Sequence, residues 1–158
     1  MALKSDRYEF QTDISFYYNQ GVADRGGVVV HGATAGSGAA MDQGANLVRY
    51  KAVVEGDIPV GLLLNDVVNL DLTRRHINIY KDEVQLGGKV TVLRKGYVVT
   101  NMIDNLDVSA GEVAYASSVN AGNISNSGSA PLAIGRFLSA KDEDGYAKVE
   151  VNLPTTGV

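Results

Sequence analysis

The sequence has no cysteine and no tryptophan, and only 3 prolines among its 158 residues. The absence of cysteine excludes disulfides, thiolate nucleophiles and thiolate metal ligands, so stability is left to packing, with or without subunit association. The chain has 2 histidines, His31 and His76, and neither has a partner at the spacing of a zinc site. We therefore expect no metal ion and no cofactor.

An excess of positive charge is also lacking, because the formal net charge is −4 at pH 7. Without a global positive field that attracts phosphates, we expect no nucleic acid partner. The longest apolar runs, near residues 58–64, are far shorter than the roughly 18 residues of a membrane helix. The first residues become polar at Lys4 and lack the apolar core of a secretion signal. We expect no membrane contact and synthesis in the cytoplasm.

Catalytic motifs are missing as well. The serines lie in turn-rich stretches without a Gly-x-Ser-x-Gly elbow, and no cysteine nucleophile exists. The glycine-rich segment 32–38 lacks the Lys-Ser/Thr pair of a phosphate-binding loop. The segment Asp142-Glu-Asp-Gly145 resembles the start of a calcium loop, but a strand pattern follows it, so we expect an ordinary turn there. We therefore expect that the protein is not an enzyme.

The clearest positive signal is the alternation of residues 147–153. Ala147, Val149, Val151 and Leu153 fall on one face of a strand, and polar residues fall on the other. This pattern indicates a strand with one buried and one solvated face, typical of an antiparallel sheet. The preceding Asp144-Gly145 pair predicts a hairpin turn, because glycine readily takes a positive φ.

Residues 8–18 form the longest alternation in the chain. The apolar residues among its even positions are Tyr8, Phe10, Ile14, Phe16 and Tyr18. The stretch is longer than a typical strand. It is compatible with a long strand of the core sheet or with an arm that reaches beyond its own domain, and both interpretations bury the even face.

Short strands separated by turns account for the rest of the chain. We expect strands within residues 27–31, 46–55, 77–80, 89–93, 96–100 and 107–115, and a strand or a short helix within 60–72. The chain has 18 glycines, and those from Gly32 to Gly44 predict a loop that orders against a partner. The predicted fold is mainly β, a single antiparallel β-sandwich or small β-barrel with an extended N-terminal arm. We divide it into residues 1–20 (arm), 21–45 (glycine-rich loops) and 46–158 (β-rich core).

Several segments resemble the cement, or decoration, proteins that tailed phages place on their capsids. In these proteins a glycine-rich turn precedes a strand, a Gly-Glu-x-x-Tyr strand follows, and a final Gly-Arg segment leads into Val-x-Val. The matching segments are residues 58–74, 85–101, 110–115 and 134–153. They cover about the last two thirds of the chain.

The resemblance implies a non-enzymatic virion protein on the outer surface of the capsid. It implies docking onto the major capsid protein, bridging of neighbouring capsid subunits, stabilisation of the shell, and self-association as a trimer. Because aromatic side chains dominate interface energetics, we expect the even face of residues 8–18 to contact the capsid or another subunit. Further candidate contacts are Gly32, Gly36, Gly38, Arg74 and Arg75.

Three other functions stay open on the sequence alone. A carbohydrate- or host-surface-binding module would use exposed aromatics such as Tyr97, Tyr115 and Tyr146. A tail or head-fibre component of a virion would share the β-rich composition. A small hydrolase would depend on His31 or His76.

Overall fold

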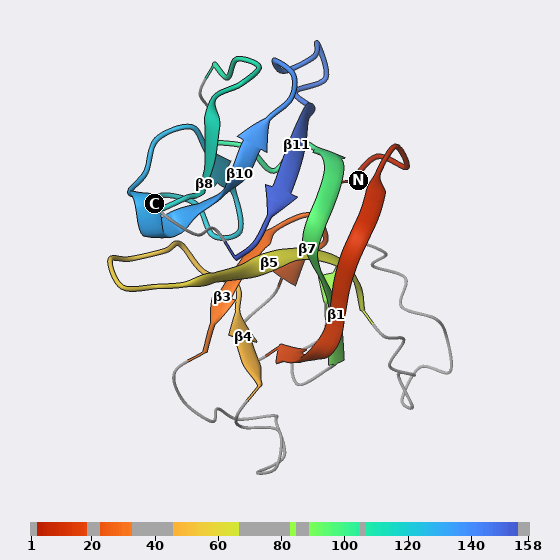
Figure 1. The fold of residues 1–158 in the computed structure, drawn as a ribbon, viewed down its shortest axis with the longest axis vertical. Coiled ribbons are helices and arrows are strands. Elements are labelled where there is room, and N and C mark those ends of the chain that lie inside the picture. Colours follow the sequence, from red (N-terminus) through yellow and green to blue (C-terminus); the bar gives the residue numbers. More distant parts are fainter. Residues whose placement is uncertain are drawn as a thin grey trace.

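A computed structural model describes residues 3–18, 23–32, 46–66, 83–84, 89–104 and 107–154. Nearly all the regular structure in these residues is β-strand, with one short 3-10 turn, η2, at Ala130–Leu132 (Figure 1). None of the described segments is a helix with the length and hydropathy needed to span a bilayer. The strands are β1 (Tyr8–Tyr18), β2 (Ala23–Asp24), β3 (Val28–His31), β4 (Leu47–Arg49), β5 (Pro59–Asp66), β6 (Glu83–Val84), β7 (Lys89–Thr100), β8 (Val113–Ala116), β9 (Ile124–Ser125), β10 (Ala133–Phe137) and β11 (Ala147–Asn152).

Nine of these strands belong to one sheet, in the order β1-β4-β3-β5-β7-β11-β10-β8-β9, and β2 pairs separately with β6. The sheet is mixed, because β1 runs parallel to β4 while the other pairs of named strands are antiparallel. The prediction of a mainly β fold is confirmed. The prediction of a purely antiparallel sheet is wrong, because β4 lies beside the C-terminal end of β1 with the same strand direction.

The longest strand, β7, connects the two halves of the sheet. One edge of β7 pairs with β1, from Tyr8 opposite Tyr97 to Tyr17 opposite Lys89. Its other edge pairs with β5 through its first half and with β11 through its second half. In Figure 1 the green β7 accordingly lies between the red β1 and the blue β11. Since β1 also pairs with β4, the strands β1, β4, β3, β5 and β7 form a closed circuit of hydrogen-bonded neighbours.

Two separate apolar cores result from this arrangement. The smaller core includes Phe16 and Tyr18 of β1, together with side chains of β3, β4, β5 and β7. The larger core contains Phe137 and includes side chains of β3, β5, β7, β8, β10 and β11. Strand β5 contributes to both, because Leu62 and Leu64 belong to the larger core and Leu63 to the smaller. The two-residue period of a strand therefore allows one sheet to cover a core on each face.

The predicted C-terminal hairpin is confirmed. Ala147, Val149, Val151 and Leu153 are all buried, and Gly145 has the positive φ, 82°, that the turn requires. The two strands expected at 89–93 and 96–100 are instead one continuous strand, β7. The strand expected within 46–55 is limited to Leu47–Arg49. The element expected within 60–72, a strand or a short helix, is a strand up to Asp66, where β5 ends. Residues 67–72 and the strand expected at 77–80 lie outside the described residues.

Residues 8–18 form the predicted strand, and β1 is hydrogen-bonded to the sheet rather than extended away from it as an arm. The expectation of a buried even face is only partly right. Phe16 and Tyr18 are buried, whereas Tyr8, Phe10 and Ile14 are exposed. The reason is that the smaller core lies under the C-terminal end of β1 only. The domain boundaries at residues 20 and 45 stay predictions.

Gly96 permits β1 to approach β7 closely. Its φ is 147°, and a Cβ atom there would collide with the carbonyl oxygen of Tyr8. By contrast, Gly56 also has a positive φ, 92°, but a Cβ atom there would meet nothing within 4 Å. A side chain at Gly96 would therefore push β1 away from β7, in addition to straining the backbone.

We expect Gly96→Ala to lower the free energy of unfolding by about 3–4 kcal/mol, because it combines backbone strain with a steric clash. The matched control Gly56→Ala carries only the backbone strain and is expected to cost about 1–2 kcal/mol. Urea denaturation of both variants measures the difference. Equal losses would show that Gly96 is not needed for the approach of β1 to β7.

Candidate docking surface

Large apolar side chains on β1 are exposed to solvent. Phe10 is 71% exposed, Ile14 54% and Tyr8 53%. Among the described residues, the other large apolar side chains that are exposed are Val54, Ile58, Val119 and Leu138. We call Tyr8, Phe10 and Ile14 the β1 surface. Scattered exposed apolar residues are normal, but three on one seven-residue stretch of a strand point to an interaction site.

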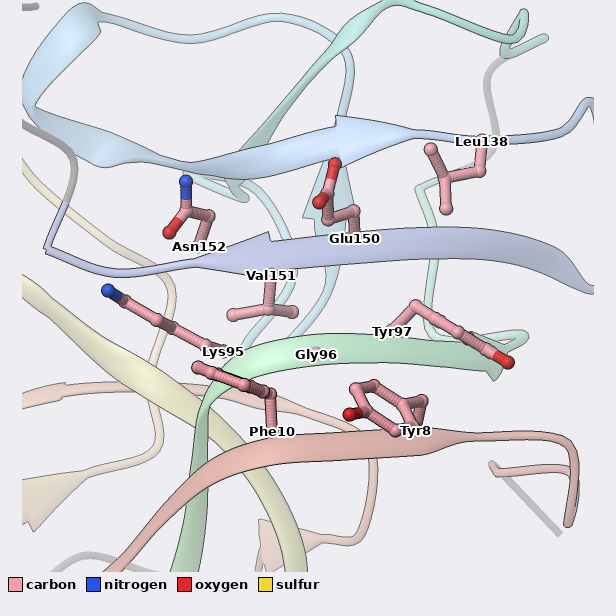
Figure 2. Close-up of a pocket in the computed structure, with 9 residues that line it drawn as sticks. All are labelled: Tyr8, Phe10, Lys95, Gly96, Tyr97, Leu138, Glu150, Val151 and Asn152. Atoms are coloured by element: carbon pink, nitrogen blue, oxygen red, sulfur yellow. The ribbon is translucent and has the colours of Figure 1, made fainter.

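Part of the β1 surface borders a shallow groove of about 300 Å³. In Figure 2, Tyr8 and Phe10 rise from β1 on one side, Leu138 and Glu150 lie on the other, and Gly96 is between them. The groove is also lined by Lys95, Tyr97, Val151 and Asn152. Because Gly96 has no side chain, the sheet is hollowed at this point.

The aromatic rings beside the groove are held in place by their neighbours. Tyr8 and Tyr97 are opposite one another in the β1–β7 register, and their rings stack with centroids 5.9 Å apart. The ammonium group of Lys148 lies 3.9 Å from the centroid of the Tyr97 ring. Such contacts restrict the rotamers of these side chains, which lowers the entropic cost of ordering them when a partner binds.

The backbone of β1 is poorly suited to adding a further strand. Its pairing with β7 is interrupted by three register irregularities. The Asp13 carboxylate accepts hydrogen bonds from the backbone N–H of Ser15, at 2.7 Å, and from its hydroxyl, at 2.6 Å, and these bonds lower the pKa of Asp13. Bulges and side chains that occupy backbone donors protect an edge from strand addition. The side chains of the β1 surface, rather than its backbone, are therefore the groups available to a partner.

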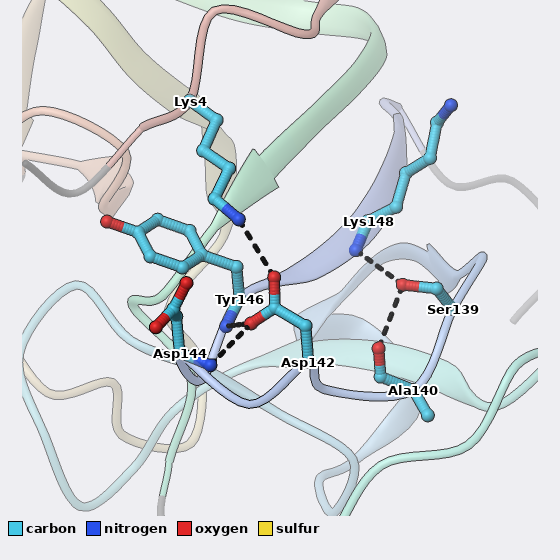
Figure 3. A network of polar contacts seen from close by, with 7 residues as sticks. All are labelled: Lys4, Ser139, Ala140, Asp142, Asp144, Tyr146 and Lys148. Carbon is cyan, nitrogen blue, oxygen red and sulfur yellow. Dashed lines mark hydrogen bonds and ion pairs between the residues drawn. The ribbon is translucent and has the colours of Figure 1, made fainter.

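The segment before β1 is hydrogen-bonded to the turn between β10 and β11 (Figure 3). Lys4 Nζ donates to Asp142 Oδ2 at 2.8 Å and lies 4.2 Å from the centroid of the Tyr146 ring. The other carboxylate oxygen of Asp142 accepts hydrogen bonds from the N–H groups of Asp144 and Tyr146. The bond from Lys4 is the largest cause of the lowered pKa of Asp142. The segment resembling a calcium loop thus acts as a turn, as predicted.

The structure places the other predicted contact residues differently. The backbone N–H of Gly32 donates to the carbonyl of Leu47 at 2.8 Å. The backbone of Gly32 is therefore hydrogen-bonded to β4. Phe16 and Tyr18 belong to the smaller core and are not available as surface contacts in this conformation. Gly36, Gly38, Arg74 and Arg75 lie outside the described residues.

The residues considered for other functions do not form one site. A lysine ammonium group lies over the ring of Tyr97 and another lies over the ring of Tyr146. Tyr115 packs beside Gly128. The His31 ring makes an edge contact with Phe16. The pKa of His31 is lowered, first because the ring is partly buried and second because the positive charge of Arg94 is nearby. His76 is not among the described residues. No three His, Asp or Glu side chains of the described segments are grouped as metal ligands.

The exposure of four residues was not predicted from the sequence: Leu138, Val54, Ile58 and Val119. Leu138 follows β10 directly, so its alternation with Phe137 was a usable signal. Val54, Ile58 and Val119 lie in turns, where neither the helical nor the strand period applies.

We expect Asp142→Asn to lower the thermal midpoint slightly at neutral pH, because asparagine keeps the turn's acceptor oxygen but loses the charge that attracts Lys4. The pKa of Asp142 is lowered from its ordinary 3.8, so its stabilisation is fully present above pH 3.8 and is lost as the pH falls through the lower folded value. Thermal melts from pH 2 to pH 7 should therefore show the two proteins converging in acid. The neighbouring Glu143→Gln is the control, and a difference that persisted at pH 2 would contradict this account.

Comparison with known families gives an independent result. Residues 10–152 match the family described as structural cement protein (E217 gp24/Pam3 gp6). No curated protein matches the chain. The match includes β1 from Phe10 onwards and every later strand. It confirms the resemblance noted in the sequence and implies association with the phage capsid and a place in the virion. The chain belongs to the structural cement protein family of phages.

Proposed function

We propose that this protein is a non-enzymatic cement protein that binds the outside of the assembled capsid and bridges neighbouring major capsid subunits. It then stabilises the shell by mass action, because a ligand that binds the intact shell and not its broken form shifts the equilibrium towards the intact form. Self-association as a trimer is part of this proposal. The observation that carries it is the β1 surface, three large apolar side chains that one strand exposes in a protein of the structural cement protein family.

We assign the β1 surface to contact with the major capsid protein. Phe10 is the most exposed side chain of the β1 surface, and the stacked Tyr8 and Tyr97 rings beside it are already ordered. Large, ordered aromatic side chains typically contribute most of the binding energy of an interface. The groove above Gly96 would accept a side chain of the partner.

We expect Phe10→Ser combined with Ile14→Ser to weaken binding to undecorated cognate capsids by about tenfold or more, since apolar anchors are lost. Both side chains are more than half exposed, so the fold should be retained. Co-sedimentation at increasing protein concentration measures the dissociation constant. Deleting the whole strand would be less informative, because Phe16 and Tyr18 belong to a core.

The matched control is Gln11→Ser combined with Thr12→Ser, which changes two exposed polar residues of the same strand. Its affinity should equal that of the wild type, and its thermal midpoint reports any general effect of changing β1. Equal capsid affinity of the Phe10/Ile14 variant and the wild type would remove the β1 surface from the docking contact. Failure of the wild type itself to bind the cognate shell would overturn the proposed function.

A further inference from the structure

The chain ahead of β1 is itself attached to the sheet. Leu3 forms an isolated antiparallel bridge with Thr100, the last residue of β7. Its side chain is only 6% exposed and belongs to the larger core. It packs over Gly26, where an added Cβ atom would lie 2.9 Å from Leu3 Cγ. The larger core therefore holds the chain at a point before β1 begins, whereas Phe16 and Tyr18 at the other end of β1 belong to the smaller core.

The next residue, Lys4, adds polar contacts with two elements. Its backbone N–H donates to the carbonyl of Val99 at 2.9 Å. Its ammonium group donates to Asp142 at 2.8 Å and lies over the Tyr146 ring (Figure 3). A single exposed ion pair contributes little to stability, so the burial of Leu3 is the larger of the two contributions. We call Leu3 and Lys4 the N-terminal clip.

The half of β1 between the N-terminal clip and Phe16 has little core beneath it. The side chains of residues 8–15 are exposed or only partly buried. The pairing of this half with β7 shifts register three times before Phe16 is reached. Segments with few buried contacts open more readily than the rest of a structure. The N-terminal clip and Phe16 hold this half at its two ends, so loss of the clip would leave one end free.

We infer that Leu3 and Lys4 are positioning residues for capsid docking, which keep Tyr8 and Phe10 ordered on the sheet before the capsid is met. This inference rests on the proposed function, in which the β1 surface contacts the major capsid protein. Leu3 is buried and does not reach a partner itself, so its effect on binding passes through β1. When only a fraction of the molecules has the binding-competent conformation, the apparent dissociation constant rises by the reciprocal of that fraction.

The test is Leu3→Ala, which shortens one buried side chain and leaves the rest of both cores in place. We expect hydrogen–deuterium exchange to show a loss of protection for the amides of residues 8–13. The amides of β11 should keep their protection, because β11 is paired on both edges. Affinity for undecorated cognate capsids should fall by about threefold or more, which corresponds to an ordered fraction of about one third or less. The ordered fraction from exchange and the affinity loss from co-sedimentation should agree.

The matched control is Leu132→Ala. Leu132 has the same exposed fraction as Leu3, 6%, and belongs to the same core, but it lies in η2 beside β8. This variant should lower the thermal midpoint at least as much as Leu3→Ala, while the exchange of β1 and the capsid affinity stay unchanged. If both variants weakened binding equally, a general loss of stability would be the cause and the inference would be wrong.

Lys4 gives a second, milder test that keeps the inference falsifiable if Leu3→Ala does not fold. Lys4→Met removes the charge that bonds to Asp142, and it should change exchange and affinity in the same direction as Leu3→Ala but by less. Lys4→Arg keeps a positive charge opposite Asp142 and should retain wild-type exchange and affinity. If the folded variants leave the exchange of residues 8–13 unchanged, the N-terminal clip does not order β1 and the inference is overturned.

Failure of this inference and failure of the proposed function give different results. If the wild type binds the cognate shell and Leu3→Ala binds equally well despite an opened β1, the inference is wrong and the proposed function stands. If the wild type does not bind the shell, the proposed function is wrong and the docking role of the N-terminal clip fails with it.

Discussion

The pairing of β1 with β7 is the interaction on which the rest of the structure depends. β7 is the one strand that joins β5 to β11 in the described sheet, and β1 covers its other edge over nearly its whole length. The C-terminal end of β1 supplies Phe16 and Tyr18 to the smaller core, and its N-terminal end carries the exposed Tyr8 and Phe10. The buried end of β1 therefore contributes to stability, and the exposed end is the one that we propose for docking.

This division explains why β1 has large apolar side chains that are not all buried. A strand that is hydrogen-bonded to its neighbour does not need to bury every apolar side chain to stay in place. Burial of the Phe16 and Tyr18 end, together with the backbone pairing opened by Gly96, fixes β1 against the sheet. The exposed end is then presented to a partner at little conformational cost, because its backbone is already ordered.

The secondary-structure elements that depend on a local residue pattern could be predicted from the sequence. The alternation of Ala147 to Leu153 and the Asp144-Gly145 turn gave the final hairpin, and residues 8–18 gave β1. The sequence could not show that β4 pairs parallel to β1, since contacts between distant strands leave no periodic trace. It also could not show that Ile14 is exposed while Phe16 is buried, because the pairing of β1 with β7 shifts register between Asp13 and Phe16, and the simple alternation of the sequence does not reveal this irregularity. The exposure of Val119 was missed for a related reason, because the turn that carries it is held by hydrogen bonds to Asp104, a residue distant from Val119 in the chain.

The most direct test of the docking account is hydroxyl-radical footprinting of the protein free in solution and bound to cognate capsids. Oxidation of Phe10 and Tyr8 should fall strongly on binding, because these side chains become covered, while oxidation of Tyr146 on the β10–β11 hairpin should stay unchanged. Equal oxidation of Phe10 in the free and capsid-bound protein would contradict the account, because the β1 surface would then still be exposed to solvent on the shell.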